Sequence, residues 1–129
     1  MADESLVFWV GRSGRRYAYY VYPLGQILSA APGNFIYARL NDRGQWDALY
    51  VGEAADLATI TASERMLALA REKGATHLHA HLTLGNRDGR FDEQADLRER
   101  FGPEAEAGAE TLAASDGASI GESLAATPA

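Results

Sequence analysis

The chain has 129 residues, of which 47% are hydrophobic, and its formal net charge is −6. This length supports one modest core rather than two independent domains. The chain has no cysteine, which excludes disulfides, thiolate catalysis and cysteine-bearing zinc sites, and it has no apolar run near the about 20 residues that a membrane-spanning helix needs.

Two hairpins open the predicted order of elements. Residues 5–10 and 17–22 are rich in aromatic and β-branched side chains, and the glycines between them supply a turn. A third strand is expected at 34–40 and a fourth at 46–51, joined by turn-forming residues. Both pairs of strands should be antiparallel.

The pattern then changes to helix, strand and helix. Ser63 can cap a helix over 63–73, and Gly74 is a helix-ending residue. Residues 76–84 alternate as in a strand, and 91–101 predict a second helix. The buried candidates of that last helix are Phe91, Leu97 and Phe101.

The end of the chain has a different composition. Residues 104–129 are mainly small or polar and hold five acidic residues with no Lys or Arg. We expect a disordered acidic tail there, behind a domain at 1–103. The other 13 acidic residues nearly balance the 12 Lys and Arg, so bulk charge does not indicate nucleic-acid binding. A local basic group remains possible at Arg12, Arg15 and Arg16, with further arginines at Arg87, Arg90, Arg98 and Arg100.

The start of the chain bears on localisation. It is acidic where a secretory signal would be basic. We therefore expect a cytoplasmic protein without a membrane partner.

Several short motifs occur in a fixed order. They are Phe35-Ile36-Tyr37, Tyr50-Val51-Gly52 with the continuation Glu53-Ala54-Ala55-Asp56-Leu57, and Gly74-Ala75-Thr76-His77. In these motifs the chain resembles the GIY-YIG nuclease superfamily, over residues 17–103. The resemblance implies an α+β fold with a small antiparallel sheet flanked by helices, here with an extra N-terminal β-hairpin.

The last predicted helix adds spacing to this resemblance. The superfamily pattern is roughly Arg-x-x-x-Glu-x-Asp-Leu-x-x-x-Tyr/Phe-x-Pro. The residues in step with it are Arg90, Gln94, Asp96, Leu97, Phe101 and Pro103. The position of the metal-binding glutamate is thus occupied by Gln94.

The resemblance implies particular roles for a few residues. Tyr37 or Tyr50 would position or deprotonate the attacking water, and an arginine ten residues after Tyr50 would stabilise charge on the phosphate, but Ile60 stands there. Gln94 brings no negative charge to hold Mg²⁺ or Mn²⁺, which would be the metal of an active enzyme. Losing both groups should leave little phosphodiester hydrolysis. We therefore expect a catalytically degenerate nuclease fold that serves as a nucleic-acid or protein interaction module.

Two alternatives remain open. An active endonuclease could have moved its metal ligand to Glu93 or to histidines such as His77 and His79, and its phosphate contact to Arg65 or Arg90, with Gly52 as a further candidate for nucleic-acid binding. A protein-binding module without nucleic acid would fit the near-neutral body and acidic tail.

Structural roles compete with each of these functional hypotheses. His77, His79 and His81 alternate along one strand face, which suits a metal but also an ordinary half-exposed strand. The aromatic residues of the first hairpin could stack nucleic-acid bases or pack internally; they are Trp9, Tyr17, Tyr19, Tyr20 and Tyr22. The carboxylates of the last helix are interpreted as solvated surface; they are Asp92, Glu93, Asp96 and Glu99.

Overall fold

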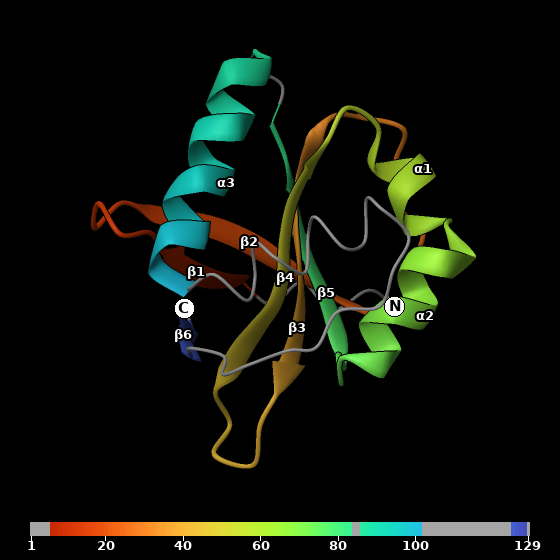
Figure 1. Cartoon of the computed structure of the whole chain (residues 1–129), viewed down its shortest axis with the longest axis horizontal. Helices are drawn as coiled ribbons and strands as arrows, with labels where there is room; N and C mark the ends of the chain where they lie inside the picture. Colours follow the sequence, from red (N-terminus) through yellow and green to blue (C-terminus); the bar gives the residue numbers. More distant parts are fainter. Residues whose placement is uncertain (1–5, 84–85, 102–124, 129) are drawn as a thin grey trace.

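The computed structural model describes residues 6–83, 86–101 and 125–128 (Figure 1). Its strands are β1 (Leu6–Val10), β2 (Arg16–Pro23), β3 (Gly33–Leu40), β4 (Trp46–Ala54), β5 (His77–Leu82) and β6 (Ala125–Pro128). Its helices are α1 (Leu57–Thr61), α2 (Glu64–Glu72) and α3 (Arg87–Phe101). None of the helices in these ranges is long and apolar enough to cross a membrane.

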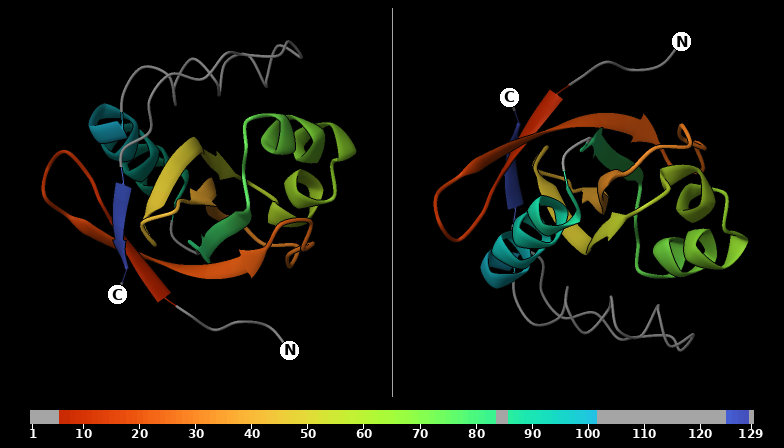
Figure 2. Two further views of the ribbon diagram at one scale, coloured as in Figure 1. Left: turned by 90° about the horizontal axis from the view of Figure 1, so that it is seen from below. Right: turned by 90° about the horizontal axis from the view of Figure 1, so that it is seen from above.

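The strands form one antiparallel sheet that curls into a closed barrel in the order β1-β2-β5-β3-β4-β6. Strand β5 lies between the two predicted hairpins, because it pairs with β2 on one side and β3 on the other. Helices α1 and α2 lie on one side of the sheet and α3 on the other (Figures 1 and 2). The predicted α+β class, with a small antiparallel sheet, flanking helices and an added N-terminal hairpin, is confirmed.

Side-chain alternation along the strands separates two apolar cores. The core inside the barrel, which α3 completes, includes Trp9, Tyr19, Val21, Ile36, Trp46, Val51, Leu97 and Phe101. The core beneath α1 and α2 includes Phe35, Tyr37, Leu49, Tyr50, Leu57, Leu78 and Ala80. The two faces of β3 thus belong to different cores.

Helix α1 was not predicted from the sequence. Asp56 caps it, because its carboxylate accepts a hydrogen bond of 3.0 Å from the backbone N–H of Ala58. With five residues it is too short to show a helical period. Helix α3 begins at Arg87 rather than at residue 91, and the prediction that Phe91 is buried is wrong, since 37% of its surface is exposed.

The end of the chain differs in part from the expected tail. Ala125–Pro128 forms β6, whose backbone pairs with β1 and with the start of β4 (Figure 2). Disorder over the whole of 104–129 is therefore wrong for these four residues, because strand pairing uses backbone groups and needs no large apolar side chain. Residues 104–124 and 129 lie outside the described part of the chain.

Candidate functional site

The two motif tyrosines face each other across a hairpin. Tyr37 on β3 pairs directly with Tyr50 on β4, and both are buried. The Phe35 ring stacks on Tyr50 with centroids 5.6 Å apart and meets Tyr37 edge-on at 5.8 Å. The two tyrosines are therefore part of a packed aromatic cluster.

Burial decides the acidity of this pair. It raises the pKa of Tyr37 to about 12, with a smaller contribution from Tyr50. Burial also raises the pKa of Tyr50, against the opposing charge of Arg98. Neither hydroxyl is ionised near neutral pH, so neither is ready to act as a general base.

Gly52 leaves space for the rings of this aromatic cluster because it has no side chain. A Cβ atom at this position would lie 2.6 Å from the Phe35 ring and 2.8 Å from the Tyr50 ring. The glycine of the second motif is thus required by packing. Its backbone is buried, which leaves it little access to a phosphate.

The position expected to hold an arginine lies in α1. Ile60 is partly buried there and packs against the core beneath α1 and α2. The next residue, Thr61, accepts a hydrogen bond of 2.9 Å from Leu28 N–H and donates one of 2.7 Å to the Leu57 carbonyl. Arg65 is exposed in the first turn of α2. The residues of α1, which follow the second motif, therefore pack this helix onto the core.

Helix α3 turns Glu93, not Gln94, towards the barrel. Only 6% of Glu93 is exposed, and its Oε2 accepts a hydrogen bond of 2.6 Å from the Tyr19 hydroxyl. The Nε2 of His81 lies 2.7 Å from the same oxygen. Burial, followed by the charge of Glu93, holds the pKa of Tyr19 well above its usual range, so Tyr19 remains a donor.

The register of α3 explains this orientation. Its buried residues are Arg90, Glu93, Leu97 and Phe101, which recur every three or four positions along one face. Gln94 is rotated by about 100° from Glu93. Together with Arg98 it lines an outer hollow of about 470 Å³. The interpretation of Glu93 as solvated surface is wrong, and its helical spacing with Leu97 is the signal that pointed inwards.

Arg90 forms a buried ion pair with Glu53. Its Nε lies 3.1 Å from Glu53 Oε2, and only 8% of its side chain is exposed. Its carbonyl accepts a hydrogen bond of 3.0 Å from the Asn34 amide. Arg90 therefore joins α3 to β3 and β4 rather than presenting a cation to solvent.

Asp96 links α3 by hydrogen bonds to the turn between β1 and β2. Its carboxylate accepts hydrogen bonds from the Ser13 N–H at 2.9 Å, the Ser13 hydroxyl at 2.7 Å and the Tyr17 hydroxyl at 2.7 Å. Partial burial acts to raise the pKa of Asp96, but the hydrogen bonds from Ser13 and Tyr17 outweigh it, and the pKa is lowered. Asp96 is partly exposed but bound to the first turn, so its interpretation as solvated surface is wrong only in part.

The histidines of β5 are not arranged as a metal site. The Nδ1 of His79 accepts a hydrogen bond of 3.0 Å from the Trp9 indole, and its ring is fully buried. His77 packs edge-on against Trp46. The histidine that contacts Glu93 is His81. The structure does not bring His77, His79 and Glu93 together, and the described ranges hold no cluster of three or more His, Asp or Glu side chains suited to a metal.

His79 carries the one buried side-chain polar atom without a partner in the described part of the chain, Nε2. Since Nδ1 accepts the indole N–H, the proton of the neutral ring sits on Nε2. Burial, and then the charge of His77, lowers the pKa of His79 to about 3. His79 is thus a neutral core residue at physiological pH.

Comparison with known proteins adds no assignment. No protein-family model, no curated protein and no solved structure matches the chain.

Proposed function

We propose that this chain is a GIY-YIG-like domain that does not hydrolyse phosphodiesters efficiently and acts as an interaction module for nucleic acid or protein. The observation that carries the proposal is the state of Glu93. This carboxylate is the inward one of α3, and one of its oxygens already accepts from Tyr19 and His81. Using it for a metal would break a buried hydrogen-bond network.

The other groups required for phosphoryl chemistry support the same proposal. Arg90 is paired with Glu53, and Ile60 stands where the resemblance implies an arginine. The buried tyrosines keep their protons. With Arg90 paired, Glu93 hydrogen-bonded and both tyrosines protonated, these described residues do not supply the main sources of phosphodiester catalysis.

A divalent metal does not fit the residues at this site. Mg²⁺ and Mn²⁺ favour carboxylate oxygens in an open octahedral arrangement. Gln94 is neutral and lies at the outer hollow of α3, and Glu93 is nearly fully buried. These residues therefore support no catalytic step through a metal.

We also propose a cytoplasmic location, which the absence of cysteine favours.

The test is a nuclease assay with purified wild-type protein. Supercoiled plasmid, linear duplex, single-stranded DNA and RNA are incubated with Mg²⁺ or Mn²⁺, beside Tyr50→Phe and Glu93→Gln variants prepared identically. We expect no cleavage above the level of the two variants. Metal-dependent cleavage by the wild type that either variant abolishes would overturn the proposal.

A further inference from the structure

The outer face of the first hairpin carries exposed aromatic residues. Strand alternation turns Trp9, Tyr19 and Val21 into the barrel, whereas Tyr20 and Tyr22 point the other way. Tyr20 is 47% exposed, and Tyr22 is partly buried beside it. The aromatic side chains of the N-terminal hairpin are therefore divided between the barrel core and the surface.

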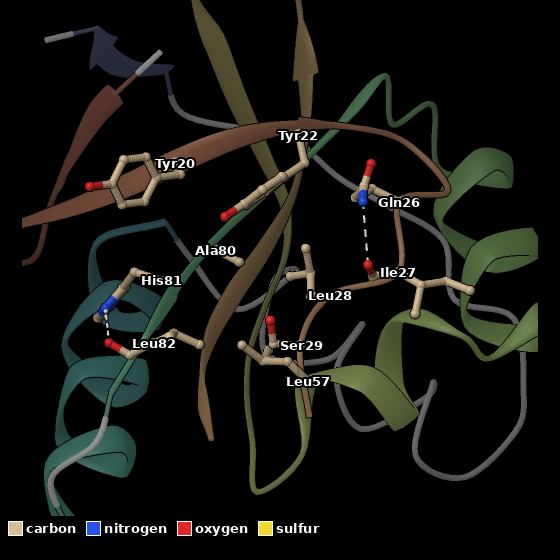
Figure 3. Close-up of a pocket in the computed structure, with 10 residues that line it drawn as sticks. All are labelled: Tyr20, Tyr22, Gln26, Ile27, Leu28, Ser29, Leu57, Ala80, His81 and Leu82. Atoms are coloured by element: carbon tan, nitrogen blue, oxygen red, sulfur yellow. Dashed lines mark hydrogen bonds between the residues drawn. The ribbon is translucent and has the colours of Figure 1, made fainter. Parts of the chain in front are cut away.

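A half-open pocket of about 550 Å³ adjoins these two rings (Figure 3). Tyr20 and Tyr22 line it from β2, Ile27 and Leu28 from the following loop, and Leu82 from β5. Five large apolar side chains are exposed among the described residues, and three of them, Tyr20, Ile27 and Leu82, line this pocket. Exposed apolar groups gathered in this way are typical of a binding surface.

The acidic residues of the chain are unevenly distributed around this surface. No acidic residue occurs between Glu4 and Asp42 or between Glu72 and Asp88, although the chain holds 18. Strands β1, β2 and β5 and the loop after β2 are therefore free of carboxylates. Arg16 begins β2, and Arg12 and Arg15 lie in the turn before it; all three are exposed.

Arg16 links the basic residues to the aromatic ones. It begins β2, and its guanidinium lies 4.3 Å above the centroid of the Phe8 ring on β1. Arg16, Tyr20 and Tyr22 are separated by even numbers of residues on one strand, so they share one face of the sheet. We call the outward side chains of Phe8, Arg16, Tyr20, Tyr22 and Leu82 the aromatic face.

We propose that the aromatic face binds single-stranded nucleic acid, with bases stacked on Tyr20 and Tyr22 and the phosphate backbone passing Arg16. The inference names the partner and the surface for the interaction role proposed above, and it rests on that role. Aromatic rings beside a basic track bind single strands with little sequence preference, because every base has a stacking face.

The spacing of the two tyrosines selects a single strand over a duplex. Side chains two residues apart on one strand face lie about 7 Å apart, because the strand rises about 3.3 Å per residue. Stacked bases in a duplex are separated by about 3.4 Å. Bases on both rings must therefore be splayed apart, which an unpaired strand permits.

The experiment is a fluorescence-anisotropy titration of the full chain with labelled 15-mers of dT and of rU. Tyr20→Ala and Tyr22→Ala are each expected to weaken binding about tenfold. Tyr20→Phe should bind within about twofold of the wild type, because it keeps the stacking ring. The matched control is Phe91→Ala, which removes an exposed aromatic ring from α3, and it should have no effect.

A salt series tests the basic part of the surface. Binding should weaken steeply between about 50 and 200 mM NaCl, and Arg16→Gln should reduce the slope of log affinity against log salt by about one. Arg43→Gln, which removes an exposed arginine from the other hairpin turn, should leave the slope unchanged.

Three results would overturn the proposal: no binding to either 15-mer at 50 mM NaCl, folded Tyr20→Ala and Tyr22→Ala variants that bind like the wild type, or duplex bound as tightly as single strands. Circular dichroism and the urea midpoint of each variant establish that it is folded. Cleavage of the oligonucleotide with Mg²⁺ would contradict the non-catalytic role instead. The two proposals can therefore fail separately.

Discussion

The hydroxyl of Tyr19 donates a hydrogen bond of 2.6 Å to Oε2 of Glu93, inside the barrel. Both side chains are buried, and the bond joins β2 to α3 across a long stretch of sequence. Hydrogen bonds to charged groups contribute more to stability than neutral ones, and a buried charge that loses its donor is costly. This contact therefore holds the last helix against the added hairpin.

Tyr19→Phe should lower the free energy of unfolding by about 1.5–3 kcal/mol, because it removes one donor from a buried carboxylate. The measurement is urea denaturation followed by circular dichroism. Tyr20→Phe removes the same hydroxyl from the exposed neighbouring ring and should change stability by less than about 0.5 kcal/mol. Equal effects of the two substitutions would show that the bond to Glu93 contributes nothing.

Gly11→Ala should destabilise the protein by about 1–3 kcal/mol, because the new Cβ would overlap the carboxylate of Asp96. Displacing that carboxylate also breaks its hydrogen bonds to Ser13. In an Asp96→Ala background the same change should cost at least about 0.5 kcal/mol less, as expected for residues in direct contact. Strictly additive effects in this double-mutant cycle would contradict the contact.

Stability should fall as the pH is lowered from about 6.5, because the pKa of His79 is about 3 in the folded state and about 6.5 in the unfolded state. Between these values the unfolded chain binds a proton that the folded chain does not. Protonation of His79 in the unfolded chain lowers the free energy of unfolding by up to about 1.4 kcal/mol per pH unit. This decrease begins below about pH 6.5 and ends near pH 3, where the folded chain binds the proton as well.

His79→Gln should remove this pH dependence between pH 6.5 and 4.5, as measured by urea unfolding at a series of pH values. Glutamine cannot be protonated there, and its carbonyl can still accept from Trp9. His77→Gln, at a partly exposed position of the same strand, is the control and should leave most of the slope in place. An unchanged slope in His79→Gln would mean that other groups cause it.

Gly52→Ala should destabilise the protein by about 1–3 kcal/mol or more, since the Phe35 and Tyr50 rings leave no space for a methyl group. Gly89→Ala is the matched control. Its added Cβ would have its nearest neighbour at 3.7 Å, and alanine suits a helix better, so stability should rise by about 0.5–1 kcal/mol. Thermal unfolding of both variants would decide this, and a neutral Gly52→Ala would contradict the close packing.

The sequence predicted most of the fold because the strands alternate and the longer helices have an apolar face. The hairpins before residue 55 and α2 were located within a few residues. Helix α1 depends on the cap at Asp56 rather than on a period, and β6 depends on the backbone edges of β1 and β4. Neither kind of contact leaves a strong local pattern.

The candidate site was predictable only as far as single elements allowed. The placement of Tyr37 and Tyr50 on the two strands of one hairpin followed from the sequence, and in the structure the two residues are direct partners. The burial of Glu93 depends on Tyr19 and His81, which come from two other strands. Likewise, Asp96 receives its donors from the first turn. Such long-range partners cannot be identified from the local sequence of α3.

Both tryptophans of the chain, Trp9 and Trp46, contact His79. Trp9 donates its indole N–H to the histidine, and the Trp46 ring meets it edge-on with centroids 4.4 Å apart. All tryptophan emission of this protein therefore originates beside one titratable ring. Intrinsic fluorescence would report on the centre of the barrel without any added label, and a histidine forced to take up a proton there would change the brightness of both indoles.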